Sequence, residues 1–221
     1  ETLEMYRSLY TGVFKRRYID GEWTAGDGLI YDMFDETYNT YDDSGRPAGL
    51  YWTATRYIAC DYGTANPFVL LDIYDDGEVR WVDNEYRWSS RETLRQKTDG
   101  EYGDDLQDFR GRDPQYFCPV IVDPSAASFI AELQRRGVYV IAGDNDVPDG
   151  IRRVSSLLGR RIIRIHRRCE GLTGELCSYV WDSKAALAGV EKPVKNLDHG
   201  PDALRYYVNT CLPKWRYGEE G

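Results

Sequence analysis

The sequence predicts one α/β domain, over residues 51–212, built on a mixed sheet with helices on both faces. Two observations predict this class. Three apolar runs between residues 56 and 85 are separated only by short turns, and strands connected so closely form an antiparallel meander. Between residues 119 and 165, short apolar runs alternate with helical patterns, which is typical of parallel strands joined by crossover helices.

The meander occupies the first part of this domain. Its strands are predicted at residues 56–61, 68–74 and 78–85. An Asp-Asp-Gly turn joins the second strand to the third. Residues 89–97 then have a helical pattern with Ser90 as a candidate N-cap, whereas residues 100–112 are too polar to predict an element.

The parallel part follows the meander. The predicted order is strand, helix, strand, helix, strand, at residues 119–123, 126–136, 138–142, 148–158 and 161–165. Gly137 marks the end of the first of these helices. Two more helices are predicted at residues 172–180 and 198–211.

The ends of the chain lack a clear pattern. Residues 1–50 are predicted to be a linker or wrapping segment, with one short helix at residues 3–14, and residues 213–221 to be a tail. The chain begins at Glu1 rather than Met, so we expect a fragment or a processed product.

Composition excludes several classes of protein. No apolar run approaches the roughly 20 residues that a membrane-spanning helix needs, and no signal peptide is visible. Five cysteines without a CxxC pair, and only two histidines, predict no structural zinc site. Free thiols are expected in a reducing cytoplasm. The chain has no GxxxxGK[ST] loop and no GxSxG motif, so nucleotide hydrolysis by a P-loop and a serine hydrolase are both excluded.

Charge is distributed unevenly along the chain. The net charge of −9 argues against non-specific binding of nucleic acid. Between residues 152 and 168, however, there are seven arginines and His166, and no acid. Such a basic stripe can bind a polyanion, although it could equally be a solvated arginine-rich hairpin.

Two acidic residues follow predicted strands. Asp61 comes directly after YIAC, and Asp123 directly after PVIV. Ligands of α/β sheets bind beyond the carboxyl ends of the parallel strands, so both carboxylates are expected at one edge. Two such charges repel each other unless a cation neutralises them, and oxygen ligands favour Mg²⁺ or Mn²⁺. Each aspartate taken alone could simply begin a turn.

The start of the last predicted helix supplies a third element. Asp198 is a candidate N-cap, and Pro201 is tolerated in the first turn. His199 and Asp202 are three residues apart, so they share one helix face that could meet the strand ends. The alternative is that Asp198 and Asp202 only cap the helix.

These residues lie in longer stretches that resemble one family. The runs CDYGTANPFVLLDI, VIVDPSAASFIAELQRRG, DVPDGIRRVSSLL and KPVKNLDHGPDALRYYV are similar to the nuclease domain of the bacteriophage terminase large subunit. The upstream GEW…GLIYDMFD is similar to the segment that joins this nuclease to the packaging ATPase. The resemblance covers residues 20–210. It implies a ribonuclease H-like fold and cleavage of double-stranded viral DNA by two divalent ions, Mg²⁺ or Mn²⁺.

The resemblance also implies roles for single residues. Asp61 matches the acid that touches both metals, and Asp123 the acid on one metal. Asp202 and His199 match the acid and the histidine expected at the other metal. Asp198 is expected either to cap the helix or to exchange roles with Asp202.

The resemblance finally implies partners. Double-stranded DNA is one of them, and the uneven distribution of charge predicts that it contacts a face that flanks the acids and carries Arg160, Arg164, Lys192 and Lys195. An upstream ATPase domain, a small terminase subunit and a portal are expected in the host cytoplasm, with no membrane. Another ribonuclease H-like enzyme, such as a resolvase or integrase, is the first alternative. A non-catalytic DNA-binding module is the second, and an actin-like ATPase would need glycine-rich loops that are missing here.

Overall fold

A computed structural model describes residues 28–63, 66–111 and 117–213. The strands of its sheet are β1 (Thr40–Tyr41), β2 (Thr55–Asp61), β3 (Phe68–Asp75), β4 (Arg80–Trp88), β5 (Val120–Val122), β6 (Val140–Ala142) and β7 (Ile163–His166). The shorter helices are α3 (Glu36–Asn39), η1 (Asp43–Gly45), α4 (Leu50–Thr53), α5 (Ser90–Thr93) and α10 (Ser183–Leu187). The longer helices are α6 (Asp99–Arg110), α7 (Ala127–Arg135), α8 (Val147–Gly159), α9 (Glu170–Ser178) and α11 (His199–Cys211).

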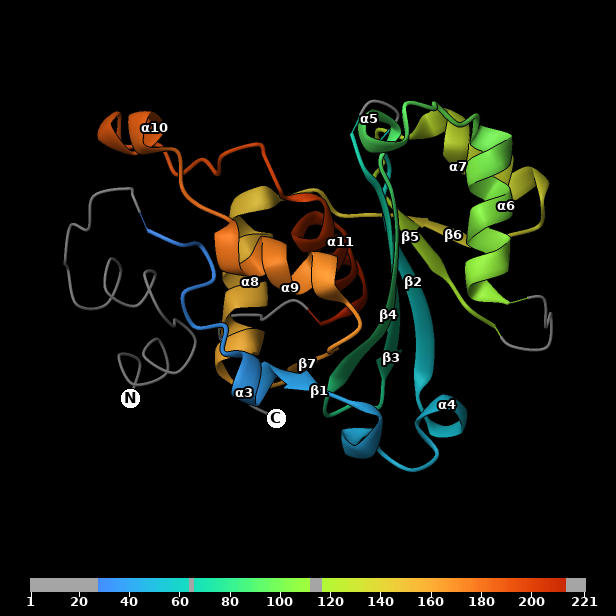
Figure 1. Cartoon of the computed structure of the whole chain (residues 1–221), viewed down its shortest axis with the longest axis horizontal. Helices are drawn as coiled ribbons and strands as arrows, with labels where there is room; N and C mark the ends of the chain where they lie inside the picture. The colour runs from blue at the N-terminus through green and yellow to red at the C-terminus, as the bar shows by residue number, and fades with distance from the viewer. Residues whose placement is uncertain (1–27, 64–65, 112–116, 214–221) are drawn as a thin grey trace.

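The seven strands form one mixed sheet in the order β1-β7-β4-β3-β2-β5-β6. β2, β3 and β4 pair antiparallel, as the short turns predict. β5 and β6 join parallel at one side, and β7 and β1 join parallel at the other. Figure 1 shows the sheet between two helical layers, with α8, α9 and α11 on one face and α6 and α7 on the other. The predicted mixed sheet with helices on both faces is confirmed.

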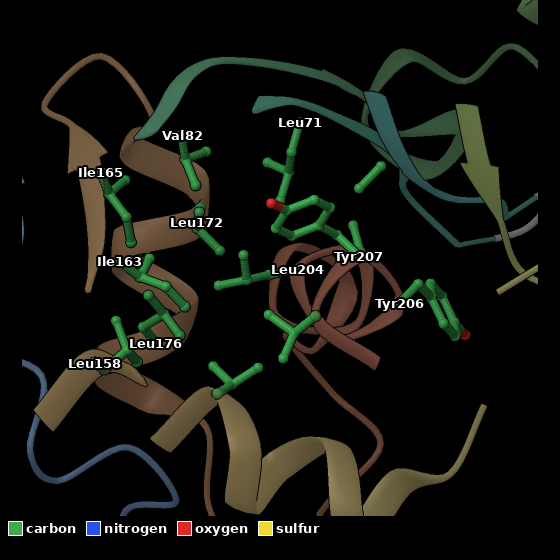
Figure 2. Close-up of a cluster of buried hydrophobic side chains, with 14 of the residues drawn as sticks. Leu71, Val82, Leu158, Ile163, Ile165, Leu172, Leu176, Leu204, Tyr206 and Tyr207 are labelled. Carbon is green, nitrogen blue, oxygen red and sulfur yellow. The ribbon is translucent and has the colours of Figure 1, made fainter. Parts of the chain in front are cut away.

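Alternation along the strands divides most of the core into two clusters, and a third, smaller cluster contains Tyr41, Leu50, Tyr74 and Trp81. Ile58 and Cys60 of β2 pack with Val122 of β5 in the cluster under α6 and α7. Ala59 and Ile121 lie in the other cluster, under α8, α9 and α11. Figure 2 shows part of this second cluster, where Leu204 and Tyr207 of α11 face the side chains of the sheet. Side chains on a strand alternate between the two faces, so the residue at each strand end has a predetermined side.

Several predicted boundaries shift for local reasons. The third strand begins at Arg80 because the carboxylate of Asp76 accepts hydrogen bonds from the backbone N–H of Glu78 and Val79, which lengthens the turn. The last strand begins at Ile163, and Arg161 before it has a left-handed φ of 60°.

Two helix predictions need correction. The helix predicted at residues 89–97 is the single turn α5, and its N-cap is Ser89 rather than Ser90. It ends at Leu94, which has a left-handed φ of 52°. The polar stretch 100–112 is largely the long helix α6, which starts with a capping box between Thr98 and Glu101.

Residues 28–50 contribute to the same sheet. β1 pairs with β7, placing Thr40 opposite Ile165. Asn39 reaches across to donate to the backbone oxygen of Leu158 at 2.9 Å. The division at residue 50 stays a prediction, and the helix predicted at residues 3–14 lies outside the described residues. Among the described helices, none is both long and apolar enough to cross a membrane.

Candidate active site

Strand alternation places two aspartates on the same face of the sheet. Asp61 is the last residue of β2, and Asp123 follows directly after β5. The two strands are parallel neighbours, with Cys60 opposite Val122. Since Cys60 and Val122 point toward α6 and α7, the next residue of each strand points toward α11. The predicted strand-end acids therefore share one edge and one face.

The first turn of α11 faces these strand ends. His199 begins the helix, and its Nδ1 lies 2.8 Å from Oδ2 of Asp61. Asp202 is one turn further along and is only 6% exposed. The structure thus brings the histidine of the DHGPDALRY motif directly onto the first strand-end acid.

Three carboxylates act on one another electrostatically at this site. Burial, followed by the negative charges of Asp202 and Asp123, raises the pKa of Asp61 to about 6, although the contact with His199 opposes this rise. The raised pKa of Asp61 indicates that the site has too little positive charge to balance its three carboxylates. A bound cation would supply that charge.

The pKa of His199 moves in the complementary direction. Burial by itself lowers this pKa, but Asp61, Asp198 and Glu175 raise it, so that the net change is upward. The Asp61 contact is the larger of these raising effects. Each of these two side chains therefore favours the charged form of the other.

Two cationic side chains hold Asp202. Nζ of Lys195 lies 3.1 Å from Oδ2 of Asp202 and 3.3 Å from Oδ2 of Asp198. Nε of Arg205, a residue that is only 1% exposed, donates to Oδ1 of Asp202 at 3.1 Å. Asp198 makes no side-chain capping bond to the helix, so the interpretation of Asp198 as a simple cap finds no support in the hydrogen bonds.

The donors at the site have the chemistry that a hard divalent ion needs. Carboxylate oxygens dominate, and the imidazole of His199 adds one nitrogen. Within the described ranges, however, no three acidic, histidine or cysteine side chains lie close enough together to enclose a metal ion. Each carboxylate is instead held by a protein donor or cation: Asp61 by His199, Asp202 by Lys195 and Arg205, and Asp123 by Tyr206. A cation and Lys195 would therefore compete for the same oxygen of Asp202.

Arg205 and three further supporting residues escaped prediction from the sequence. Oε2 of Glu175, on α9, accepts the backbone N–H of Gly200 at 2.7 Å and so holds the start of α11. Arg87 of β4 pairs with Oε1 of the same carboxylate at 2.7 Å. The third of these is Tyr206, whose hydroxyl donates to Asp123. The sequence gives no clear signal for Glu175, because α9 also carries Glu170 and Thr173 and the pattern does not show which polar side chain is buried.

The basic stripe lies elsewhere in the fold. β7 pairs with the first residues of β4, and these pair with the end of β3 that adjoins the start of β2. This end of the sheet is opposite Asp61. Arg164 donates to the backbone oxygen of Thr40 at 3.0 Å, and Arg160 follows the end of α8, which packs over β7. The structure thus does not bring these two arginines to the carboxylates.

Of the four predicted DNA-contacting residues, only Lys195 touches the acids. Lys192 is an exposed residue three positions earlier in the same segment. His166, predicted to be structural or DNA-facing, is buried and accepts the backbone N–H of Arg168 at 3.1 Å. Its ring packs edge-on against Tyr41.

The chain is similar to solved structures of known proteins over nearly its whole length. No protein-family model matches the sequence, and no curated protein is significantly similar to it. Among solved structures, a large terminase from a thermophilic bacteriophage, in complex with ADP, is 44% identical, with a TM-score of 0.86 over 95% of this chain. The chain is thus similar to phage large terminases over nearly its whole length, and it spans 51% of the length of that protein.

Two further structures share the fold at lower identity. The P22 large terminase nuclease domain is 17% identical, with a TM-score of 0.65 over 84% of this chain and 93% of that domain. The large terminase nuclease from thermophilic phage G20c with bound magnesium is 11% identical, with a TM-score of 0.62 over 82% of this chain and 97% of that one. The predicted resemblance and the ribonuclease H-like fold class are confirmed.

Proposed function

From the similarity of this chain to phage large terminases over nearly its whole length, we propose that it is the endonuclease that cuts double-stranded viral DNA during genome packaging. One observation carries the proposal. Asp61 and Asp123 end neighbouring strands on one face, and α11 presents His199 and Asp202 toward them. Metal-dependent phosphodiester hydrolysis uses acids that converge in this way, and metal binding would have to draw these carboxylates closer together than they lie here.

The proposal includes two divalent ions, Mg²⁺ or Mn²⁺, held by Asp61, Asp123, Asp202 and His199. The G20c nuclease has been solved with bound magnesium and with bound cobalt. Three carboxylates oppose a charge of +4 with −3, which leaves a positive pocket for a phosphodiester. Such ions supply an activated water and stabilise the attacking and leaving oxygens of an in-line displacement.

The residues of the chain then have distinct tasks. His199 lowers the pKa of Asp61, which burial and the neighbouring carboxylates nevertheless hold at about 6. Arg205 fixes Asp202 from the buried side. Lys195 holds the same carboxylate from the exposed side, and its displacement frees one ammonium group for a DNA phosphate.

DNA contact by Lys195, Lys192, Arg160 and Arg164 stays part of the proposal. Phosphate contacts carry no sequence information, so low sequence specificity is expected. Each contact adds about 0.9 to the slope of log affinity against log salt concentration. Lys195 contacts Asp198 and Asp202, and Lys192 lies three residues before it in the chain, whereas the arginines lie at the other end of the sheet. We therefore expect Lys192→Ala with Lys195→Ala to reduce the slope more than Arg160→Ala with Arg164→Ala.

The greater length of the large terminase, and the ADP bound to it, support an ATPase domain as a further part of the proposal. A small terminase subunit and a portal are proposed as partners from the resemblance to the terminase family alone. We place this activity in the host cytoplasm. All five cysteines are free thiols, which suits a reducing compartment.

Plasmid cleavage tests the proposal directly. Purified protein is incubated with supercoiled plasmid in Mg²⁺, Mn²⁺ or EDTA, alongside Asp61→Asn and the surface control Asp104→Asn, whose carboxylate pairs with Arg136 far along the chain from the site. We expect cleavage with either metal, none in EDTA, and none by Asp61→Asn with a native circular dichroism spectrum. Cleavage that survives EDTA or the Asp61→Asn change refutes it. Preferential cutting of a four-way junction would favour a resolvase instead.

A further inference from the structure

We infer that Tyr206 is a positioning residue, whose hydroxyl fixes the orientation of Asp123 at the proposed metal site. The inference rests on the proposed function of that site. Tyr206 lies on α11, one turn after Asp202, and its hydroxyl donates to Oδ2 of Asp123 at 2.9 Å. It thereby connects the helix that carries Asp202 with the strand end that carries Asp123.

Asp123 needs such a partner because its own backbone gives it little support. It follows the last residue of β5, in the turn that leads to α7. Its other oxygen, Oδ1, accepts the backbone N–H of Ser125 at 2.9 Å. That bond is local to the turn, so the hydroxyl of Tyr206 is the group that relates Asp123 to the rest of the site.

Tyr206 is itself held firmly in place. The residue is 2% exposed, and the guanidinium carbon of Arg205 lies 4.6 Å from the centre of its ring. A Cβ added at Gly143 would lie 3.2 Å from three carbons of Tyr206, so the chain just after β6 passes close against this side chain. A clamped ring gives its hydroxyl a well-defined position, which a positioning role requires.

The hydroxyl of Tyr206 is protonated and so can donate. Burial, together with the negative charges of Asp61, Asp202 and Asp123, raises the pKa of Tyr206 well above its usual range. A phenol is protonated at neutral pH in any case, so the geometry of the hydroxyl, which donates to Oδ2 of Asp123 at 2.9 Å, carries the inference.

The next residue provides a matched control. The hydroxyl of Tyr207 donates to Oδ2 of Asp75 at 2.8 Å, at the end of β3 that lies away from Asp61. Figure 2 shows Tyr206 and Tyr207 leaving α11 in different directions, with Tyr207 toward Leu71 and Tyr206 away from the labelled cluster. Tyr207→Phe thus removes an equally short tyrosine–aspartate bond from the same helix without touching the site.

Calorimetric titration of the full chain with Mn²⁺, without DNA, tests the inference. We expect Tyr206→Phe to weaken Mn²⁺ binding by at least about tenfold, as loss of a partner behind a metal ligand does. Tyr207→Phe should bind Mn²⁺ as the native chain does. In an Asp123→Asn background, Tyr206→Phe should add little further loss, since the residue acts through Asp123.

The possible results distinguish failure of the proposed metal site from failure of the proposed role of Tyr206. If the native chain binds no Mn²⁺, the proposed metal-dependent function fails, and the role of Tyr206 fails with it. If the native chain binds Mn²⁺ and Tyr206→Phe binds it equally well, only the positioning role is overturned. Equal losses in Tyr206→Phe and Tyr207→Phe would also overturn it. Should Tyr206→Phe fold poorly, Gly143→Ala displaces the ring with its hydroxyl intact and is expected to weaken Mn²⁺ binding by a smaller factor.

Discussion

Removal of the charge on Asp61 should stabilise the metal-free protein. Ionised Asp61 is buried beside two further carboxylates, and its pKa is about 6 instead of the ordinary 3.8. A raised pKa in an acid means that the folded state favours the protonated form. The destabilising effect is therefore absent below pH 3.8, appears as the pH rises, and is complete above about pH 6.

The size of this effect follows from the two pKa values. At about 1.4 kcal/mol per pH unit, the difference between 3.8 and about 6 corresponds to about 3 kcal/mol of lost stability at neutral pH. The asparagine in the variant Asp61→Asn is neutral and nearly the same shape, so it avoids this loss. His199 opposes the gain, because its raised pKa stabilises the folded state below about pH 6.5 and depends on the charge of Asp61. We therefore take roughly 6–12 °C in Tm as the upper limit of the increase for a chain of this size.

Thermal unfolding in EDTA at pH 4 and pH 7.5 measures the effect. Asp61→Asn should melt several degrees above the native chain at pH 7.5 and at the same temperature at pH 4. Asp83→Asn is the control of opposite sign, since Tyr41, Tyr51 and Arg46 bond its carboxylate and its pKa lies below the usual value. It should melt below the native chain at pH 7.5. A Tm for Asp61→Asn that equals or falls below the native value at pH 7.5 would refute the reasoning.

Further predictions concern metal, packing and the ammonium group at the site. Mn²⁺ should raise the native Tm more at pH 7.5 than at pH 5.5, because binding must displace the proton of Asp61; equal increments contradict this. Gly150→Ala should cost about 1–3 kcal/mol in chemical denaturation, since its new Cβ would lie 2.4 Å from a side-chain carbon of α11. Gly174→Ala, with nothing within 4 Å, should instead stabilise α9 by about 0.5–1 kcal/mol. Lys195→Met, which leaves Asp202 without its exposed cation, should tighten Mn²⁺ binding in calorimetry and weaken DNA binding; unchanged values for both would contradict its placement.

Local pattern determined the positions of the acidic residues. Alternation along β2 and β5 places Asp61 and Asp123 on one face because a strand has a fixed side-chain period of two. The spacing of His199 and Asp202 placed both near one face of α11, since residues three apart are neighbours on a helix. These rules need no knowledge of distant parts of the chain, and they predicted the mixed sheet as well.

The sequence contains a signal for the start of α6, but the polar composition of this stretch argued against a helix. α6 is mostly polar, yet Thr98 and Glu101 form the capping box that begins it. The arginine stripe looked like one surface in the sequence. In the fold, Arg153 is buried against the backbone oxygen of Leu212, and Arg168 pairs with Asp43, because each arginine meets a different neighbour.

Only the tertiary structure decided what supports the acids. Tyr206 reaches Asp123 from 83 residues away, and Glu175 holds the N–H of Gly200 from another helix. Such contacts depend on which strands are neighbours and on how far each helix is shifted along the sheet. Periodicity determines the face of a strand or helix on which a side chain lies. The residue that this side chain contacts is determined by packing between segments far apart in the chain.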